Sequence, residues 1–244
     1  MKRKWKLWMI AFVVFVMTDI MMQSNRAEAK KRTFTVSSKT IPCSSSYRQK
    51  PYYNKKTKQY YMINSYMRRL STTGGTLKLK KGTYKIPGTI YVPSNVKIVC
   101  ANGVKIKKTK ATGTKKVKST KFLFQMISEE KASGKQNTGK YAASKNASIQ
   151  GNGKVIFDMG NVNGATAVFV GHASGITVSG VRFRNKKGGS YIWIEGSKNI
   201  SVRQCVFERK KDVSGLKIEW LQGFKQAIRQ HRIFLVNGTK KTIL

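Results

Sequence analysis

The stretch VFVGHASGITVSGVRF at residues 168–183 returns 24 residues later as IWIEGSKNISVRQCVF at residues 192–207. Apolar residues occupy the matched positions, and polar residues separate them, so each copy alternates with the period of two that is typical of a half-buried strand. A fixed period with strand patterning inside it indicates a solenoid whose units stack on one another. Because a unit of this length is too short to contain a helix, the sequence predicts a parallel β-helix with short strands in each coil.

The turn residues support the same interpretation. Gly175, Asn199 and Gly223 follow one another at intervals of 24, and each immediately precedes an apolar residue. Asn95 has the same setting earlier in the chain. Glycine and asparagine adopt positive φ at the lowest cost. We therefore expect a sharp left-handed bend at the same point of successive coils.

The N-terminus has the pattern of an export signal. Basic residues at 2–6 precede an apolar run at 7–17, and Ala27-Glu28-Ala29 has the form of a cleavage site. The apolar run is short for a transmembrane helix, which needs about 20 residues. The sequence thus predicts a signal peptide at residues 1–29 and a secreted or cell-surface protein, with membrane attachment as the alternative if the signal stays uncleaved.

The remaining chain divides by pattern. Apolar residues at helical spacing between Tyr60 and Leu70 predict an amphipathic helix that caps the open end of the solenoid. Asn237-Gly238 lies between two short apolar runs and predicts a hairpin. The expected organisation is a basic irregular lead-in at 30–58, a β-helix domain at 59–228 and an atypical tail at 229–244.

Charge and cysteines narrow the class of partner. The chain has 49 Lys and Arg against 9 Asp and Glu, a formal net charge of +40. Such a surface attracts polyanions, and for an exported protein these are acidic polysaccharides or cell-wall polymers. The lysines accompany no nucleic-acid-binding motif, which argues against nucleic acid. The three cysteines are an odd number and form no complete disulfide framework, so we expect buried free thiols. Metal binding is not expected, because His172 and His231 have no metal-ligand spacing with the cysteines.

Stacking by one coil places residues 24 apart side by side. Phe169, Trp193 and Lys217 should then form one outward ladder, in which the aromatic rings would bind sugar faces. Glu195 and Glu219 should form a second ladder beside it.

His172 should lie near Glu195 in the same arrangement. A pair of close carboxylates and a proton-transfer group are what acid–base cleavage of a glycan requires. The short separation expected for Glu195 and Glu219 suits retaining glycosidases better than inverting ones. Neutralisation of the two carboxylates by nearby lysines is the alternative interpretation.

The run GGTLKLKKGTYKIPGTIYVPSNVKI at residues 74–98 resembles the opening coils of the pectate-lyase-like superfamily, and residues 165–209 resemble its later coils. The resemblance implies an all-β, single-stranded right-handed parallel β-helix with an N-terminal capping helix. It also implies a secreted protein that acts on polysaccharide. Polygalacturonase-type hydrolases carry an N-x-D strand, an Asp pair and a G-H-G turn, none of which is present in this sequence. WIEG at 193–196 departs from the W-I-D-H segment of calcium-dependent lyases, so calcium enters only if the chemistry is lyase-like.

These observations favour a polysaccharide lyase or glycoside hydrolase ancestry. The tail after residue 228 loses the repeat, which suggests a chain shortened relative to its relatives and inactive in this form. The alternative is a non-catalytic module, monomeric like the enzyme, that binds polyanions or cell surfaces through its positive charge.

Overall fold

The structure, a computed structural model, describes residues 32–134, 138–208, 213–219, 233–237 and 240–243. The signal peptide predicted at residues 1–29 lies outside these ranges. Within them, no helix is both long enough and apolar enough to cross a membrane.

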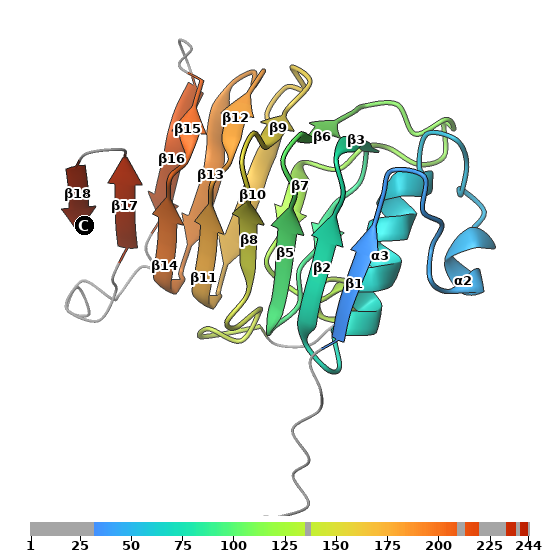
Figure 1. Ribbon diagram of the computed structural model, residues 1–244, viewed down its shortest axis with the longest axis horizontal. Coiled ribbons are helices and arrows are strands. Elements are labelled where there is room, and N and C mark those ends of the chain that lie inside the picture. The colour runs from blue at the N-terminus through green and yellow to red at the C-terminus, as the bar shows by residue number, and fades with distance from the viewer. Residues whose placement is uncertain (1–31, 135–137, 209–212, 220–232, 238–239, 244) are drawn as a thin grey trace, which may run out of the picture. The chain divides into compact units, whose positions relative to one another are not determined.

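Three sheets run along the chain, and five successive coils each add one strand to every sheet (Figure 1). Sheet A consists of β1 (Arg32–Val36), β2 (Gly75–Leu79), β5 (Val96–Cys100), β8 (Ser148–Gly151), β11 (Ser174–Ser179), β14 (Lys198–Arg203), β17 (Ile233–Asn237) and β18 (Lys240–Ile243). Sheet B consists of β3 (Gly82–Ile86), β6 (Val104–Lys108), β9 (Ile156–Asp158), β12 (Arg182–Arg184) and β15 (Val206–Phe207). Sheet C consists of β4 (Ile90–Tyr91), β7 (Phe122–Gln125), β10 (Thr166–Gly171), β13 (Gly189–Glu195) and β16 (Val213–Glu219).

Strand pairing confirms the predicted fold class. Ile176 faces Ile200 and Val178 faces Val202 in parallel register, as the interval of 24 residues requires. The other described pairings are parallel as well, apart from the antiparallel pair of β17 with β18. The chain is an all-β parallel β-helix.

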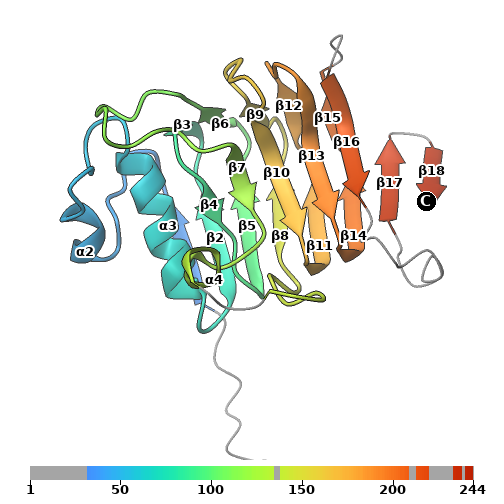
Figure 2. The same cartoon turned by 180° about the vertical axis from the view of Figure 1, so that it is seen from behind.

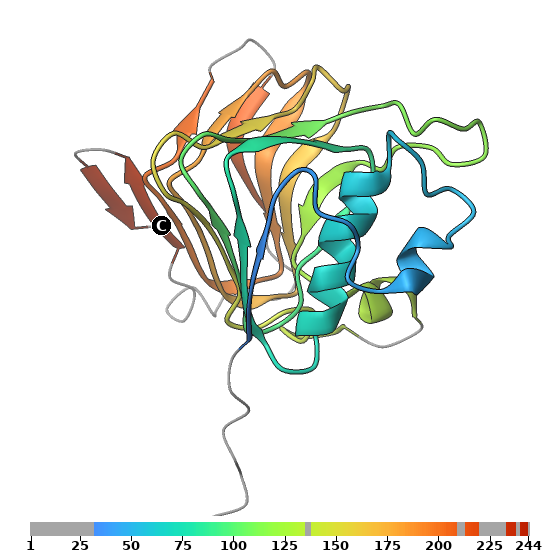
Figure 3. The same ribbon diagram turned by 45° about the vertical axis from the view of Figure 1, so that its right-hand side comes forward.

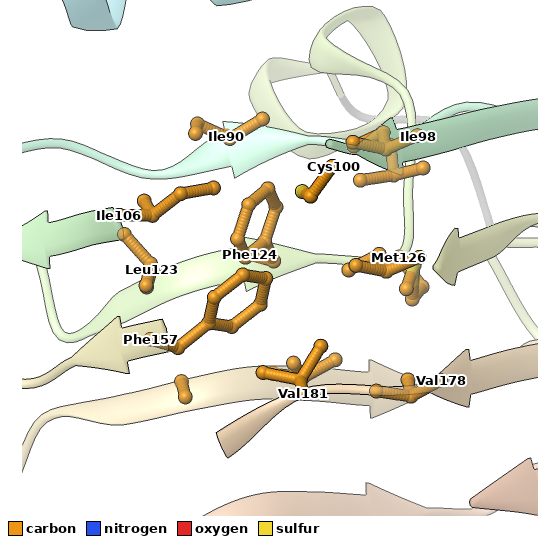
Figure 4. Close-up of a cluster of buried hydrophobic side chains, with 14 of the residues drawn as sticks. Ile90, Ile98, Cys100, Ile106, Leu123, Phe124, Met126, Phe157, Val178 and Val181 are labelled. Atoms are coloured by element: carbon orange, nitrogen blue, oxygen red, sulfur yellow. The ribbon is translucent and has the colours of Figure 1, made fainter. Parts of the chain in front are cut away.

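The core lies between the three sheets and is continuous from coil to coil (Figure 4). Phe124 of sheet C stacks on Phe157 of sheet B with ring centroids 5.2 Å apart, and both side chains are fully buried. Cys100 lies beside them as a buried thiol. Each apolar side chain of this size contributes about 1.5–3 kcal/mol when it leaves water, so stacking coils is what stabilises the solenoid.

The predicted left-handed bends are present. Asn95, Gly175 and Asn199 have φ values of 60°, 67° and 55°. Asn95 immediately precedes β5 of sheet A, and Gly175 and Asn199 are the second residues of β11 and β14 in the same sheet. Gly223, the next expected member, lies outside the described residues. The recurrent Gly or Asn is thus a consequence of one bend repeated in successive coils.

The N-terminal lead-in is more regular than the sequence predicts. Residues 32–36 form β1, which pairs in parallel with β2 and extends sheet A by one strand. A short helix, α2 (Ser45–Arg48), follows. The prediction of an irregular segment over 30–58 was wrong here because β1 has no repeat partner in the sequence, and its five residues are too few to show a clear period.

Helix α3 (Lys58–Leu70) lies at the first coil, where sheets B and C end (Figure 2). Its inward face, which includes Met62, Ile63, Met67 and Leu70, belongs to the hydrophobic core. The predicted capping helix is therefore confirmed, and it begins two residues earlier than Tyr60. A third helix, α4 (Glu129–Ser133), lies in the connection between β7 and β8.

Candidate functional site

The predicted ladder of residues lies on sheet C. Phe169 of β10 faces Trp193 of β13, and Trp193 faces Lys217 of β16. Phe169 and Trp193 are half-buried, whereas their strand neighbours Val168 and Ile192 are fully buried in the core. The alternation directs the two rings and the lysine away from the core, on the outer face of the sheet.

Two further residues join this ladder. The ring of Phe122 stacks on that of Phe169, with centroids 4.5 Å apart and an interplanar angle of 9°. Trp193 meets Phe169 nearly edge-on at 5.1 Å. The ammonium groups of Lys121 and Lys217 lie 5.0 Å and 4.9 Å from the Trp193 ring centroid. We call these five residues the sheet C platform: three touching rings, with the ammonium groups of two lysines against the ring of Trp193.

The sequence did not reveal Lys121 and Phe122 because they stand outside the interval of 24 residues. Phe122 pairs with Thr166 across the long connection between β7 and β10. The insertion changes the offset between coils, so a search for one fixed period cannot find the pair. The available signal was the apolar FLF run that follows Lys121. This run predicts a strand, but it does not show which strands lie beside it.

The candidate acid–base residues are next to the platform. Glu195 follows Trp193 by two positions on β13 and faces Glu219 of β16 in the strand register. Glu195 is half-buried. The predicted adjacency of the two glutamates is therefore present at the level of the backbone, and their chemical role stays a prediction.

His172 lies at the bend that follows β10. Its backbone N–H donates to the carbonyl oxygen of Glu195 at 3.0 Å, and its φ of 51° places it in the left-handed region. The Nδ1 atom is buried and has no hydrogen-bond partner among the described residues. The bend thus holds an imidazole one coil before Glu195, as the sequence predicts, while its proton-transfer role is not tested by this geometry.

A metal is not supported at this site. Among the described residues, no group of three or more His, Cys, Asp or Glu side chains is placed to hold a metal ion. Calcium requires about six to eight oxygen ligands, and the register brings together two glutamates here. The described residues therefore do not fit the calcium that lyase-like chemistry implies.

Comparison with known proteins yields structural likenesses alone. No family model matches the chain, and no curated protein matches it. Similar solved structures include ORF18 of Geobacillus virus E2 (18% identity, 73% of this chain and 32% of that chain, TM-score 0.47). A second is PfbA, a surface adhesin of Streptococcus pneumoniae (15% identity, 84% of this chain and 43% of that chain, TM-score 0.47). A third is an iota-carrageenase from A. fortis (20% identity, 70% of this chain and 43% of that chain, TM-score 0.46). The chain spans less than half the length of each.

Proposed function

We propose that this chain is an exported β-helix protein of the pectate-lyase-like type that binds acidic polysaccharide on the sheet C platform. The observation that carries the proposal is the contact of three aromatic rings with one another and of two lysine ammonium groups with Trp193. Aromatic rings give a sugar ring an apolar face to stack on, and ammonium groups attract the carboxylate or sulfate groups of the same polymer.

Charge explains why the glycan should be acidic. The ammonium groups of Lys121 and Lys217 both lie about 5 Å from the ring centroid of Trp193. Lys186, buried beside sheet C, has its pKa lowered to about 8 mainly by burial, and the charge of Lys121 lowers it further, so these two ammonium groups repel each other. A neutral sugar would leave that repulsion in place, whereas an anionic one relieves it.

The test is binding of polygalacturonate, a sulfated galactan and neutral dextran to the full chain. We expect micromolar binding of the two acidic polymers, weaker binding as salt rises and none of dextran. Lys121→Gln with Lys217→Gln should weaken binding about tenfold or more. The matched control, Lys78→Gln with Lys97→Gln, removes the same charge from exposed positions of sheet A. Equal losses in both variants, or equal binding of dextran, would refute the platform.

Cleavage of the bound glycan is a second candidate, favoured by the register of Glu195 with Glu219 beside Trp193. In that case one glutamate acts as general acid and the other as base or nucleophile, with His172 as a proton-transfer group. Reducing ends would appear if the chain is a hydrolase, and unsaturated products if it is a lyase. Activity should fall by a factor of about 100 or more in Glu195→Gln, whereas polymer binding should persist. Binding without any product identifies the chain as a non-catalytic surface-binding module.

A further inference from the structure

A second basic surface lies at the start of helix α3, and none of the sheet C platform residues lines it. A groove of about 610 Å³ is enclosed by the start of α3, strands β3 and β6, and the residues that follow β6. Five lysines line it: Lys55, Lys56, Lys58, Lys85 and Lys107. The rest of the described lining is amide, hydroxyl and Ala111, so these residues bring neither a carboxylate nor an aromatic ring to the groove.

A second, more open hollow adjoins the groove. This second cavity, of about 800 Å³, is formed by the loop of residues 108–120 and shares Lys56 and Ala111 with the first. It adds Lys110, Lys115 and Lys118. Figure 3 shows this loop between β6 and β7 extending beyond α3, beside the segment that leads into the helix. Two adjoining hollows lined by lysines suit a chain of anions better than a single ion.

The loop that forms the outer wall is fixed in place. The buried ammonium of Lys108 donates to the carbonyl oxygens of Gly88 and Phe122, which ties the loop's first residue to the strand that follows it. Asn54 Nδ2 donates to the carbonyl oxygen of Thr112 at 2.9 Å, which joins the loop to the lead-in. Both walls are therefore built before any ligand arrives, and a preformed site loses less entropy on binding.

The lining selects among polyanions. Sulfated or carboxylated glycans and single-stranded nucleic acids bring sugar or base rings, which bind best where aromatic side chains give them a stacking surface. The described lining of this groove offers none. Its cations are lysines, compact point charges with three rotatable donors each, which can follow successive phosphates along a flexible chain. Five ammonium groups around one groove also repel one another until an anion enters.

We propose that this lysine groove is a separate binding site for a linear polymer that carries phosphate groups on a flexible backbone without rings. It shares no residue with the sheet C platform, so each site can fail without the other. The ligand would lie along the groove with successive phosphates against successive lysines and continue into the loop cavity.

The experiment compares two variants of the full chain that lose equal charge. The groove variant combines Lys55→Gln, Lys56→Gln, Lys58→Gln and Lys85→Gln, all at exposed positions. The control variant combines Lys78→Gln, Lys80→Gln, Lys81→Gln and Lys97→Gln, which are also exposed but lie outside the groove. Affinity for inorganic polyphosphate is measured by calorimetry over a range of salt concentrations, with dextran sulfate and polygalacturonate as competing probes.

We expect the groove variant to bind polyphosphate at least about tenfold more weakly, and the slope of log Kd against log salt to fall by about three. The control should keep most of the affinity, and Lys121→Gln with Lys217→Gln should leave polyphosphate binding unchanged. Equal losses in the two lysine variants would overturn the proposal, because net charge would then explain the binding. Equally tight binding of dextran sulfate at the groove would overturn the phosphate class.

Discussion

Gln59 and Asn64 of helix α3 each take the place of a residue in a missing strand. Gln59 Nε2 donates to the carbonyl oxygen of Thr83 at 3.2 Å, and its Oε1 accepts from the N–H of Lys85 at 2.6 Å. Asn64 does the same at sheet C. It donates to Thr89 O at 3.0 Å and accepts from Tyr91 N at 3.1 Å. A residue of a parallel strand bonds its neighbour in this pattern, so the helix satisfies the first edges of two sheets.

Replacing Asn64 should therefore open the N-terminal end of the solenoid. Asn64 is 2% exposed, and Asn64→Leu leaves the carbonyl of Thr89 and the N–H of Tyr91 without those partners. We expect a loss of about 2–4 kcal/mol in the free energy of unfolding, measured with urea. The exposed Asn152→Leu is the control and should change it by about 0.5 kcal/mol or less.

Hydrogen exchange separates a local effect from a general one. In Asn64→Leu the amide of Tyr91 should exchange faster, whereas that of Ile200, several coils away, should keep its protection, because each coil contacts mainly its neighbours. Equal acceleration at both amides would contradict the idea that Asn64 acts as a strand substitute.

The sequence was sufficient for the fold where the repeat is regular. The later coils share an interval of 24 residues, so Phe169, Trp193 and Lys217 can be aligned from their spacing alone. Elsewhere the offset varies: Gly75 faces Val96, whereas Lys97 faces Ser148. Insertions between strands destroy the period without changing the stacking, which is why the earlier pairings and the role of Phe122 were not predicted.

Buried polar groups were the other feature that the sequence did not predict. Pattern analysis assigns a lysine to the surface, yet Lys108 and Lys186 are 0% and 1% exposed. Each ends buried because backbone carbonyls at a corner between sheets B and C accept hydrogen bonds from its ammonium group. These partners are contributed by another coil or by the far end of a long loop, and a local sequence window contains neither.

Asp158 should make the protein sensitive to acid. The carboxylate is 2% exposed. Its Oδ2 lies 2.9 Å from Lys105 Nζ, and Oδ1 accepts from Asn185 Nδ2 and the Gly160 N–H. Burial alone would raise its pKa, but these hydrogen bonds and the Lys105 charge outweigh burial and lower it. A lowered pKa stabilises the fold above the unfolded-state value of about 4, and this contribution is lost as pH falls through the folded-state pKa.

Asp158→Asn should consequently lower the free energy of unfolding by about 2–3 kcal/mol at pH 7. This loss lies between the values typical of exposed and of buried ion pairs. The cost should shrink as pH falls below about 4, because the unfolded chain then takes up a proton, and it should be lost once pH falls through the lowered pKa of the folded carboxylate. Glu130→Gln is the control. Glu130 forms an ion pair with Arg68 at 3.4 Å, and both side chains are more than a third exposed. The substitution should therefore change the free energy of unfolding by about 0.5 kcal/mol or less. A cost for Asp158→Asn that is the same at pH 3 and pH 7 would rule out this ionic role.

Lys108 predicts a pH dependence of the same sign as that of Asp158, but in the alkaline range. Its ammonium donates to Pro87 O, Gly88 O, Thr120 Oγ1 and Phe122 O at 2.9–3.2 Å, and burial lowers its pKa to about 7. The unfolded chain holds this proton up to about pH 10.4, so the free energy of unfolding should rise from about pH 7 to about pH 10, by at most about 1.4 kcal/mol per unit.

The matched variant is Lys108→Met, which keeps much of the length of the side chain and removes the charge. The stability of the wild type minus that of the variant should increase between pH 7 and pH 9.5, as measured by urea unfolding at each pH. A difference that stays constant over this range would mean that the four oxygen acceptors keep Lys108 protonated throughout.

The three cysteines should differ in reactivity. Cys100 and Cys205 are 0% and 8% exposed, and burial raises the pKa of their thiols to about 12 and about 11. Cys43 is half-buried in the segment between β1 and α2. Since the thiolate is the reactive form, Ellman's reagent at pH 8 should label Cys43 quickly and the other two at the rate of unfolding.

Cys43→Ser should abolish the fast phase and Cys205→Ser should leave it intact. Fast labelling that survives in Cys43→Ser would show that the coil containing Cys205 opens in the native protein.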